Sequence, residues 1–136
     1  MVTIYNLKNI ELLQKHFETV RVIANASLHK SVFKHLNSQI LLDRFSDLIK
    51  NNGLILKATY GHAAAGLLIA EIRNHNEFGV LEFCIDPDAE SRIIDLLFKQ
   101  CQQQLKRRGF KKIYCNHDWF ESVNNSLIRD KFLKQS

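Results

Sequence analysis

The stretch from Phe78 to Asn116 constrains the fold of this chain more than any other part. Its first apolar run ends at Pro87, and proline closes a strand because it cannot donate to a sheet ladder. A longer segment with apolar residues at helical spacing follows, and a second apolar run comes after Gly109. Two strands joined through a helix are most simply parallel neighbours with a right-handed crossover. Such a unit places a helix N-terminus just beyond a strand end, where a phosphate-bearing cofactor can dock.

Turn signals and apolar periodicity divide the rest of the chain into strands and helices. Asn9 is a suitable cap for the first helix, and Asn51, Asn52 and Gly53 supply the stop of the second. Gly61 and His62 predict a two-residue hairpin turn. The expected elements are, in order, strand Val2–Tyr5, helix Ile10–Ala24, helix Ser31–Lys50, strand Leu54–Tyr60, strand Ala63–Ile72, strand Gly79–Ile85, helix Glu90–Arg108, strand Phe110–Asn116 and a last helix from about Ser122 that carries Val123, Leu127 and Phe132.

Length and composition limit the class of protein. The 136 residues suit one compact domain, residues 1–136, and 46% apolar with 24% charged residues is usual for a soluble globular protein. No apolar run is long enough to span a membrane, and the N-terminus lacks the pattern of a secretory signal. We therefore expect a cytoplasmic protein without membrane association.

The cysteines and histidines predict neither disulfides nor a metal site. Cys84 and Cys115 fall in apolar strand patterns, and Cys101 falls on the apolar face of a helix. Buried reduced thiols explain these positions best. The six histidines form no spacing typical of zinc ligands.

The net charge of +5 is modest, but basic residues gather near the end of the third helix. Cations at a helix C-terminus complement its dipole, so a solvated helix end is the simplest interpretation. Contact with an anion or, less expected, with a nucleic acid is the alternative. The cluster consists of Lys106, Arg107, Arg108, Lys111 and Lys112.

The order of elements, together with particular motifs, resembles the Gcn5-related N-acetyltransferase (GNAT) superfamily. The segment GLILKATYGHAAAGLLIAEI resembles that family's central hairpin, in which a glycine opens the second apolar half, here Gly66. The segment LEFCIDPD resembles its fourth strand, which ends in an aliphatic residue, a spacer and a proline, here Ile85, Asp86 and Pro87. LLFKQCQQQLKRRGFKKIYC resembles the helix and fifth strand that follow. The resemblance implies an α+β fold with a mixed, mostly antiparallel sheet flanked by helices, in the order β-α-α-β-β-β-α-β-α.

The resemblance also implies an N-acyltransferase that uses acetyl-CoA or another acyl-CoA as co-substrate and a small-molecule or peptide amine as acceptor. In that family the fourth and fifth strands splay apart, the pantetheine arm enters the gap, and the turn before the helix wraps the pyrophosphate. If the strand carries a β-bulge at Cys84 or Ile85, a backbone N–H there can polarise the thioester carbonyl. The matching cofactor-binding positions are Phe83, Cys84, Ile85, Ser91, Arg92, Ile93 and Asn125.

A general base must take a proton from the attacking ammonium group, and Glu82 is the candidate because a semi-buried carboxylate can have a raised pKa. Pairing of Glu82 with a Lys or Arg across the sheet is the alternative interpretation, and His117 and Asp118 are a second option for the base. The family's last helix commonly carries a tyrosine that protonates the leaving thiolate, and the segment 127–130 has none. Tyr114 is therefore the candidate acid, with a core role as its alternative.

Alternation along the expected strand Gly79–Ile85 should separate its side chains onto two faces. The expected faces are Leu81, Phe83 and Ile85 on one side, and Val80, Glu82 and Cys84 on the other.

The turn before the third helix departs from the family's pattern. It contains no glycine, and Asp86, Asp88 and Glu90 would repel a pyrophosphate, with Arg92 as the one basic compensation. Acidic residues here are otherwise ordinary caps that complement the helix dipole. The family usually ends with two further strands, for which the sequence leaves no apparent room after the last helix. A non-catalytic binding or regulatory module, which forms a homodimer or pairs with a partner protein at an open fifth strand, is therefore the alternative function.

Overall fold

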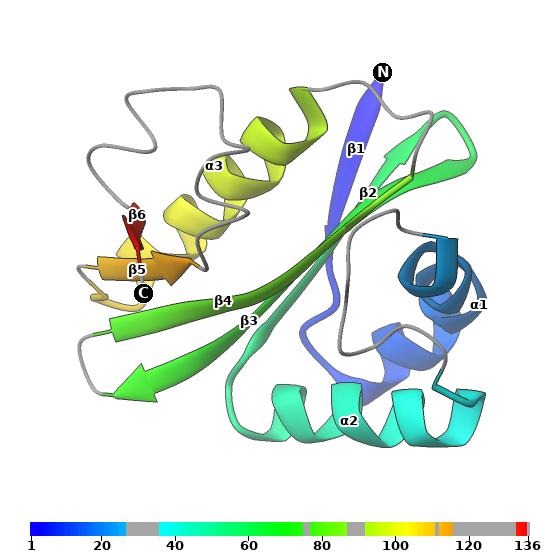
Figure 1. The fold of residues 1–136 in the computed structure, drawn as a ribbon, viewed down its shortest axis with the longest axis horizontal. Helices are drawn as coiled ribbons and strands as arrows, with labels where there is room; N and C mark the ends of the chain where they lie inside the picture. Colours follow the sequence, from blue (N-terminus) through cyan, green and yellow to red (C-terminus); the bar gives the residue numbers. More distant parts are fainter. Residues whose placement is uncertain (27–35, 75–76, 87–91, 111, 116–132, 136) are drawn as a thin grey trace.

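A computed structural model describes residues 1–26, 36–74, 77–86, 92–110, 112–115 and 133–135. In this described part of the chain, six strands form one sheet in chain order, and three helices flank it (Figure 1). The elements are β1 (Val2–Asn6), α1 (Ile10–Ala26), α2 (Ser38–Lys50), β2 (Leu54–Tyr60), β3 (Ala63–Asn74), β4 (Glu77–Ile85), α3 (Arg92–Arg107), β5 (Lys112–Cys115) and β6 (Leu133–Gln135). Strands β1 to β4 pair antiparallel, and the pairs β4–β5 and β5–β6 are parallel. The predicted α+β class and the parallel crossover through α3 are confirmed.

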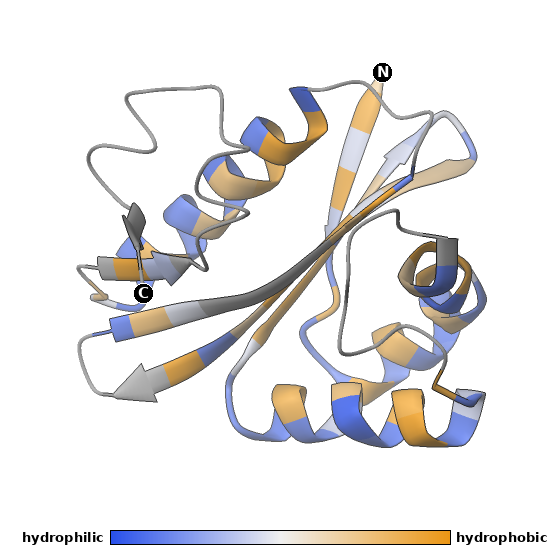
Figure 2. Ribbon diagram, viewed as in Figure 1, coloured by the Kyte–Doolittle hydropathy of each residue, from blue (hydrophilic) through white to orange (hydrophobic). Residues whose placement is uncertain are grey.

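The sheet is the middle of three layers, with α1 and α2 on one face and α3 on the other (Figure 1). Each helix turns most of its apolar residues inward, which produces the alternation of apolar and polar colour along the helices in Figure 2. The α3-side cluster includes Leu54, Leu56, Ala58, Leu68, Phe78, Leu97, Phe98, Cys101 and Ile113. The α1/α2-side cluster includes Leu13, Val20, Ile23, Leu41, Phe45, Ile55, Leu67, Ile69 and Cys84.

Local signals set the hairpin turn and the C-terminus of α3. Gly61 and His62 are the two residues between β2 and β3, and Gly61 has φ +61°, which suits the first position of a type II′ turn. Gly109 has φ +80°, and the N–H of Phe110 bonds back to the carbonyl of Leu105 at 3.0 Å. This is the hydrogen-bond pattern of a Schellman cap, so the predicted end of α3 at Gly109 is confirmed.

The predicted start of α2 at Ser31 is wrong, because the helix begins at Ser38. Asn37 has an extended backbone, and its side-chain oxygen accepts from the backbone N–H of Ile40 at 2.9 Å. An asparagine in this position caps a helix rather than continuing it. Phe33 and Leu36 continue the helical spacing of apolar residues toward the N-terminus, so the sequence analysis did not recognise Asn37 as the cap. The structure of residues 31–35 lies outside the described part of the chain.

A short strand that the sequence analysis missed pairs with β5. Strand β6 lies parallel to β5, with Ile113 opposite Leu133 and Cys115 opposite Gln135. The expectation of an open edge at β5 is therefore wrong, since β6 pairs along it. Three residues carry too little periodicity to predict a strand. The last helix expected from Ser122 lies outside the described residues.

Candidate functional site

The described pairing between β4 and β5 covers the first half of β4. Glu77 to Val80 pair with Lys112 to Cys115, and β4 then continues beside β3 as far as Ile85 (Figure 1). We call the last described pair of this ladder, Val80 and Cys115, the β4–β5 parting. Within the residues that the structure describes, β5 has four residues and β4 has nine. Among these residues, the second half of β4 pairs with β3.

A β-bulge interrupts β4 at the same point. Ile69 pairs with Glu82 and Ala70 pairs with Val80, so Leu81 is the extra residue. Side chains on the two sides of the bulge show its effect, because Phe78 and Ile85 both pack with the α3-side cluster although strict alternation would separate them. The expected alternation through Leu81 is therefore wrong.

The bulge lies earlier in β4 than the position considered from the sequence. Cys84 and Ile85 pair in regular register with Leu67 and Gly66. The irregular backbone is at Leu81, immediately beyond the β4–β5 parting. A bulge often re-aims backbone or side chains beside an active site, so this is the position from which a backbone N–H can turn out of the ladder.

The positions expected to bind a cofactor are distributed along β4 and the start of α3. Cys84 is buried in the α1/α2-side cluster, and Ile85 packs against the α3-side cluster. Arg92 is the first residue of α3 and is exposed, whereas Ile93 is buried. The backbone of Phe83 pairs with Leu68. Ser91 and Asn125 lie outside the described residues.

The two catalytic candidates lie on opposite sides of the β4–β5 parting. Glu82 follows the bulge, with its backbone opposite Ile69, and its side chain is outside the described part of the structure. Tyr114 is half-buried, and its hydroxyl donates to Oε1 of Glu77 at 2.9 Å. Because Glu77 opens β4, this hydrogen bond lies at the paired end of the strand. In the β4–β5 ladder, the backbone of Tyr114 lies opposite Gly79. His117 and Asp118 lie beyond the described residues.

A buried polar cluster under α1 was missed by the sequence analysis. Lys57 on β2 is only 4% exposed, and its Nζ donates to the hydroxyl of Thr19 on α1 at 2.7 Å. The same Nζ lies 5.4 Å from the ring centroid of Tyr5 on β1. The Tyr5 and His16 rings lie 4.8 Å apart, so the cluster joins β1, β2 and α1. A lysine inside the apolar run LILKATY is the signal that could have revealed it.

Burial and mutual repulsion shape the electrostatics of this cluster. Burial lowers the pKa of Lys57 below its usual value, because a charge loses hydration in the protein interior. Burial also lowers the pKa of His16, and the positive charges of Lys57 and Lys15 lower it further. In the part of the chain that the structure describes, no carboxylate pairs with Lys57. The ammonium is held by one hydroxyl and one aromatic ring.

The basic cluster at the end of α3 takes part in helix capping. Lys106, Arg107 and Arg108 are exposed, and Arg108 donates to the carbonyl of Asn52 at 2.7 Å. Asn52 follows the C-terminus of α2, so this cation complements the dipoles of two helices. The side chains of Lys111 and Lys112 are outside the described residues.

The described cysteines are consistent with a structural role. Cys84 and Cys101 are buried free thiols, and burial raises the pKa of Cys101 to about 12. Among the described residues, no group of three or more His, Cys, Asp or Glu side chains is arranged to hold a metal ion. None of the helices that the structure describes has the length and apolar character needed to cross a bilayer.

Comparison with known proteins finds similarity in structure but not in sequence. No protein-family model and no curated protein sequence matches the chain. The fold is similar to the ribosomal-protein-S18-alanine N-acetyltransferase of Escherichia coli, with TM-score 0.60 and 16% identity over 82% of this chain and 63% of that one. It is similar to the aminoglycoside acetyltransferase meta-AAC0020 from an uncultured soil metagenomic sample, with TM-score 0.66 and 15% identity over 92% and 88% of the two chains. A GNAT-family acetyltransferase of Streptococcus pneumoniae gives TM-score 0.61 and 15% identity over 81% and 70%.

These likenesses show that the chain has a GNAT acetyltransferase fold, which confirms the resemblance noted in the sequence. Identities of 14–16% among such neighbours establish the fold alone. The chain spans under two thirds of the length of the Escherichia coli enzyme.

Proposed function

We propose that this protein is an acyl-CoA-dependent N-acyltransferase. The observation that carries the proposal is the bulge at Leu81 of β4, directly beyond the β4–β5 parting, in a GNAT fold. We place the extended pantetheine arm alongside the part of β4 that follows this bulge. The start of α3 offers a helix N-terminus and an exposed Arg92 to an anionic group.

The residues present fit the two ends of an acyl-CoA to different degrees. Phe83, Cys84 and Ile85 lie beyond the parting, in the stretch of β4 that runs beside β3. At the other end, Arg92 and Ile93 begin α3, and Asp86 between the two elements contributes a negative charge. The arrangement therefore favours the pantetheine arm more strongly than the pyrophosphate, so we expect most of the binding free energy to come from β4.

The proposed reaction is direct transfer of the acyl group to an amine. Acetyl-CoA or another acyl-CoA supplies the thioester, whose C–S bond breaks as a C–N bond to the amine forms. Glu82 is the proposed base that takes the proton of the ammonium group, since it follows the bulge next to the parting. The backbone N–H groups at the bulge are the proposed donors to the thioester oxygen. The leaving sulfur must receive a proton. The Tyr114 hydroxyl already donates to Glu77 and would have to break that hydrogen bond, so we propose water as the acid.

Binding of acetyl-CoA tests the proposal most directly. Titration calorimetry should give measurable heat, and the melting temperature should rise with ligand concentration because a ligand stabilises the state that it binds. No heat and no rise in melting temperature at millimolar acetyl-CoA would contradict the proposal. The non-catalytic module would then be the better interpretation. If such a module bound a partner strand at β5, that strand would have to displace β6.

A pair of carboxylate substitutions tests the role of Glu82. Glu82→Gln should lower kcat by about 100-fold, the usual contribution of a positioned base, and leave CoA affinity unchanged. Glu71→Gln is the matched control, because Glu71 is an exposed carboxylate on the neighbouring strand β3. Equal activity of the Glu82 variant and the control would assign proton removal to another group or to water.

A further inference from the structure

Gly66 lies between the end of β4 and the first turn of α3. It is buried on β3, where it pairs with Ile85. A Cβ atom at this position would lie 2.8 Å from Cδ1 of Ile85 and 3.1 Å from Cγ2 of Ile93. The first distance is shorter than a real Cβ contact, so a side chain at position 66 must displace the Cδ1 end of Ile85, and the Ile93 methyl group must also give way. The absence of a side chain thus allows both isoleucine side chains to pack directly over β3.

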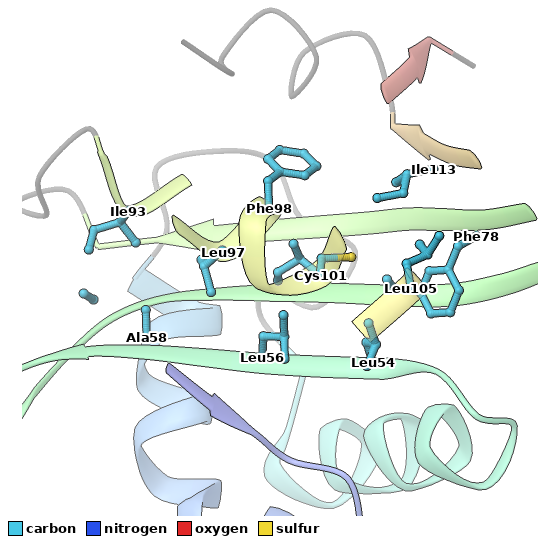
Figure 3. Packing of buried hydrophobic residues seen from close by; sticks show 13 residues of the cluster. Leu54, Leu56, Ala58, Phe78, Ile93, Leu97, Phe98, Cys101, Leu105 and Ile113 are labelled. Atoms are coloured by element: carbon cyan, nitrogen blue, oxygen red, sulfur yellow. The ribbon is translucent and has the colours of Figure 1, made fainter. Parts of the chain in front are cut away.

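The position of Ile93 can be followed in Figure 3. Ile93 stands at the start of α3 above the strand that carries Ala58, which is the partner of Gly66 in the β2–β3 register. Ile85 packs against the same α3-side cluster. The side chains of the last residue of β4 and of the first buried residue of α3 therefore both pack over Gly66.

We propose that Gly66 is a positioning residue for the acyl-CoA site, because it sets the separation between the end of β4 and the start of α3. This assignment rests on the proposed function, in which β4 takes the pantetheine arm and the start of α3 takes the pyrophosphate. Gly66 contacts neither part of the ligand, and acts through Ile85 and Ile93. A ligand that must reach both elements is sensitive to their separation, since a misplacement of about 1 Å can reduce catalysis by about 100-fold.

An effect of Gly66 on ligand binding can be distinguished from a purely steric effect on stability, because the chain contains a second crowded glycine. A Cβ at Gly53 would lie 2.8 Å from the carbonyl oxygen of Ala70 and 2.9 Å from that of Leu48. Neither Gly53 nor Gly66 has a positive φ, so the penalty for alanine is steric in both. The neighbours of Gly53 belong to α2 and β3, and they include no residue of the proposed site. The atoms that crowd Gly53 belong to the backbone, so Gly53→Ala is a more severe steric control that lies outside the site.

The experiment compares single and compensated variants in affinity for CoA and in kinetics. Gly66→Ala should weaken CoA binding and raise the KM for acyl-CoA by about tenfold or more, with the KM for the amine unchanged. Ile85→Val removes the Cδ1 atom that the new Cβ would meet, so the double variant Gly66→Ala/Ile85→Val should recover affinity to within about threefold of Ile85→Val alone. Gly53→Ala should lower the melting temperature and keep the affinity of the wild type when measured well below that temperature.

Each outcome decides between the assignment and its alternatives. Equal affinity of Gly66→Ala and the wild type would overturn the assignment, as would an equal loss of affinity in Gly53→Ala. Absence of CoA binding by the wild type would instead overturn the proposed function, and the assignment with it. If Gly66→Ala does not fold, Ile93→Ala is used instead. It removes the side chain of α3 that packs over Gly66, and it should weaken CoA binding. Leu105→Ala, at the far end of α3 in the same cluster, should not.

Discussion

The two faces of the sheet are both covered by helices, but they differ in chemistry. Among the described residues, the α3 face is packed by an apolar cluster, with Phe98, Leu97 and Cys101 of α3 completely buried (Figure 3). The α1/α2 face has a comparable apolar cluster and also buries Lys57, which contacts Thr19 and Tyr5. Both helical layers are therefore held by burial of apolar area, and in the described part of the chain the second also shields a charge.

The two faces therefore differ in how their buried side chains contribute to the free energy of unfolding. On the α3 face every buried side chain of the cluster contributes apolar area at about 25 cal/mol per Å². On the other face the ammonium of Lys57 loses hydration, and one hydroxyl and one aromatic ring compensate it in part. The two faces should consequently respond in opposite directions to removal of their central side chains.

The largest expected effect is on the apolar face. Phe98→Ala should lower the free energy of unfolding by about 3–5 kcal/mol, because it removes a completely buried ring and leaves a cavity. Urea denaturation followed by circular dichroism measures the change. Val22→Ala is the control, because Val22 is 52% exposed and its truncation should change stability by less than about 0.5 kcal/mol. A similar loss in both variants would show that α3 is not held by this cluster.

A stabilising effect is expected on the polar face. Lys57→Met should raise the free energy of unfolding by about 1 kcal/mol or more, since methionine fills a similar volume without a buried charge. The Thr19 hydroxyl keeps its hydrogen bond to the carbonyl of His16. Lys99→Met, at an exposed position in the middle of α3, should have almost no effect. Destabilisation by Lys57→Met would instead mean that the contacts with Thr19 and Tyr5 outweigh the loss of hydration.

The smallest effect is a dependence of stability on pH, and its sign is the same for both groups. The pKa of His16 is below 6.5 in the folded protein, so the unfolded chain binds a proton first and stability falls as the pH falls below 6.5. The pKa of Lys57 is below 10.5 in the folded protein, so stability rises as the pH rises toward 10.5. Denaturation midpoints across the two pH ranges measure these slopes.

Substitutions assign each slope to its group. His16→Phe should flatten the acidic range, and Lys57→Met should flatten the alkaline range. His62→Asn, in the exposed hairpin loop, should leave both ranges unchanged. Stability that increases as the pH falls below 6.5 in the wild type would contradict the repulsion between His16 and Lys57.

Much of the fold could be predicted from residues close together in the chain. The hairpin at Gly61, the end of α3 at Gly109 and the crossover from β4 to β5 each depend on a few neighbouring residues and were anticipated. The candidate site was anticipated less completely. The stretch of β4 was identified, but the bulge at Leu81 and the hydrogen bond from Tyr114 to Glu77 were not.

The sequence alone was sufficient to predict the kinds of elements from β1 to β5 and their order, because caps, turns and periodicity act over a few residues. Only the tertiary structure decided the register of β4 between its two neighbours, the pairing of β6, and the environment of Lys57. These depend on partners far apart in the chain, such as Lys57 and Thr19, whose positions differ by 38 residues. A lysine in an apolar strand is compatible with either an exposed edge or a buried charge, and the packing of α1 over β2 selects the second.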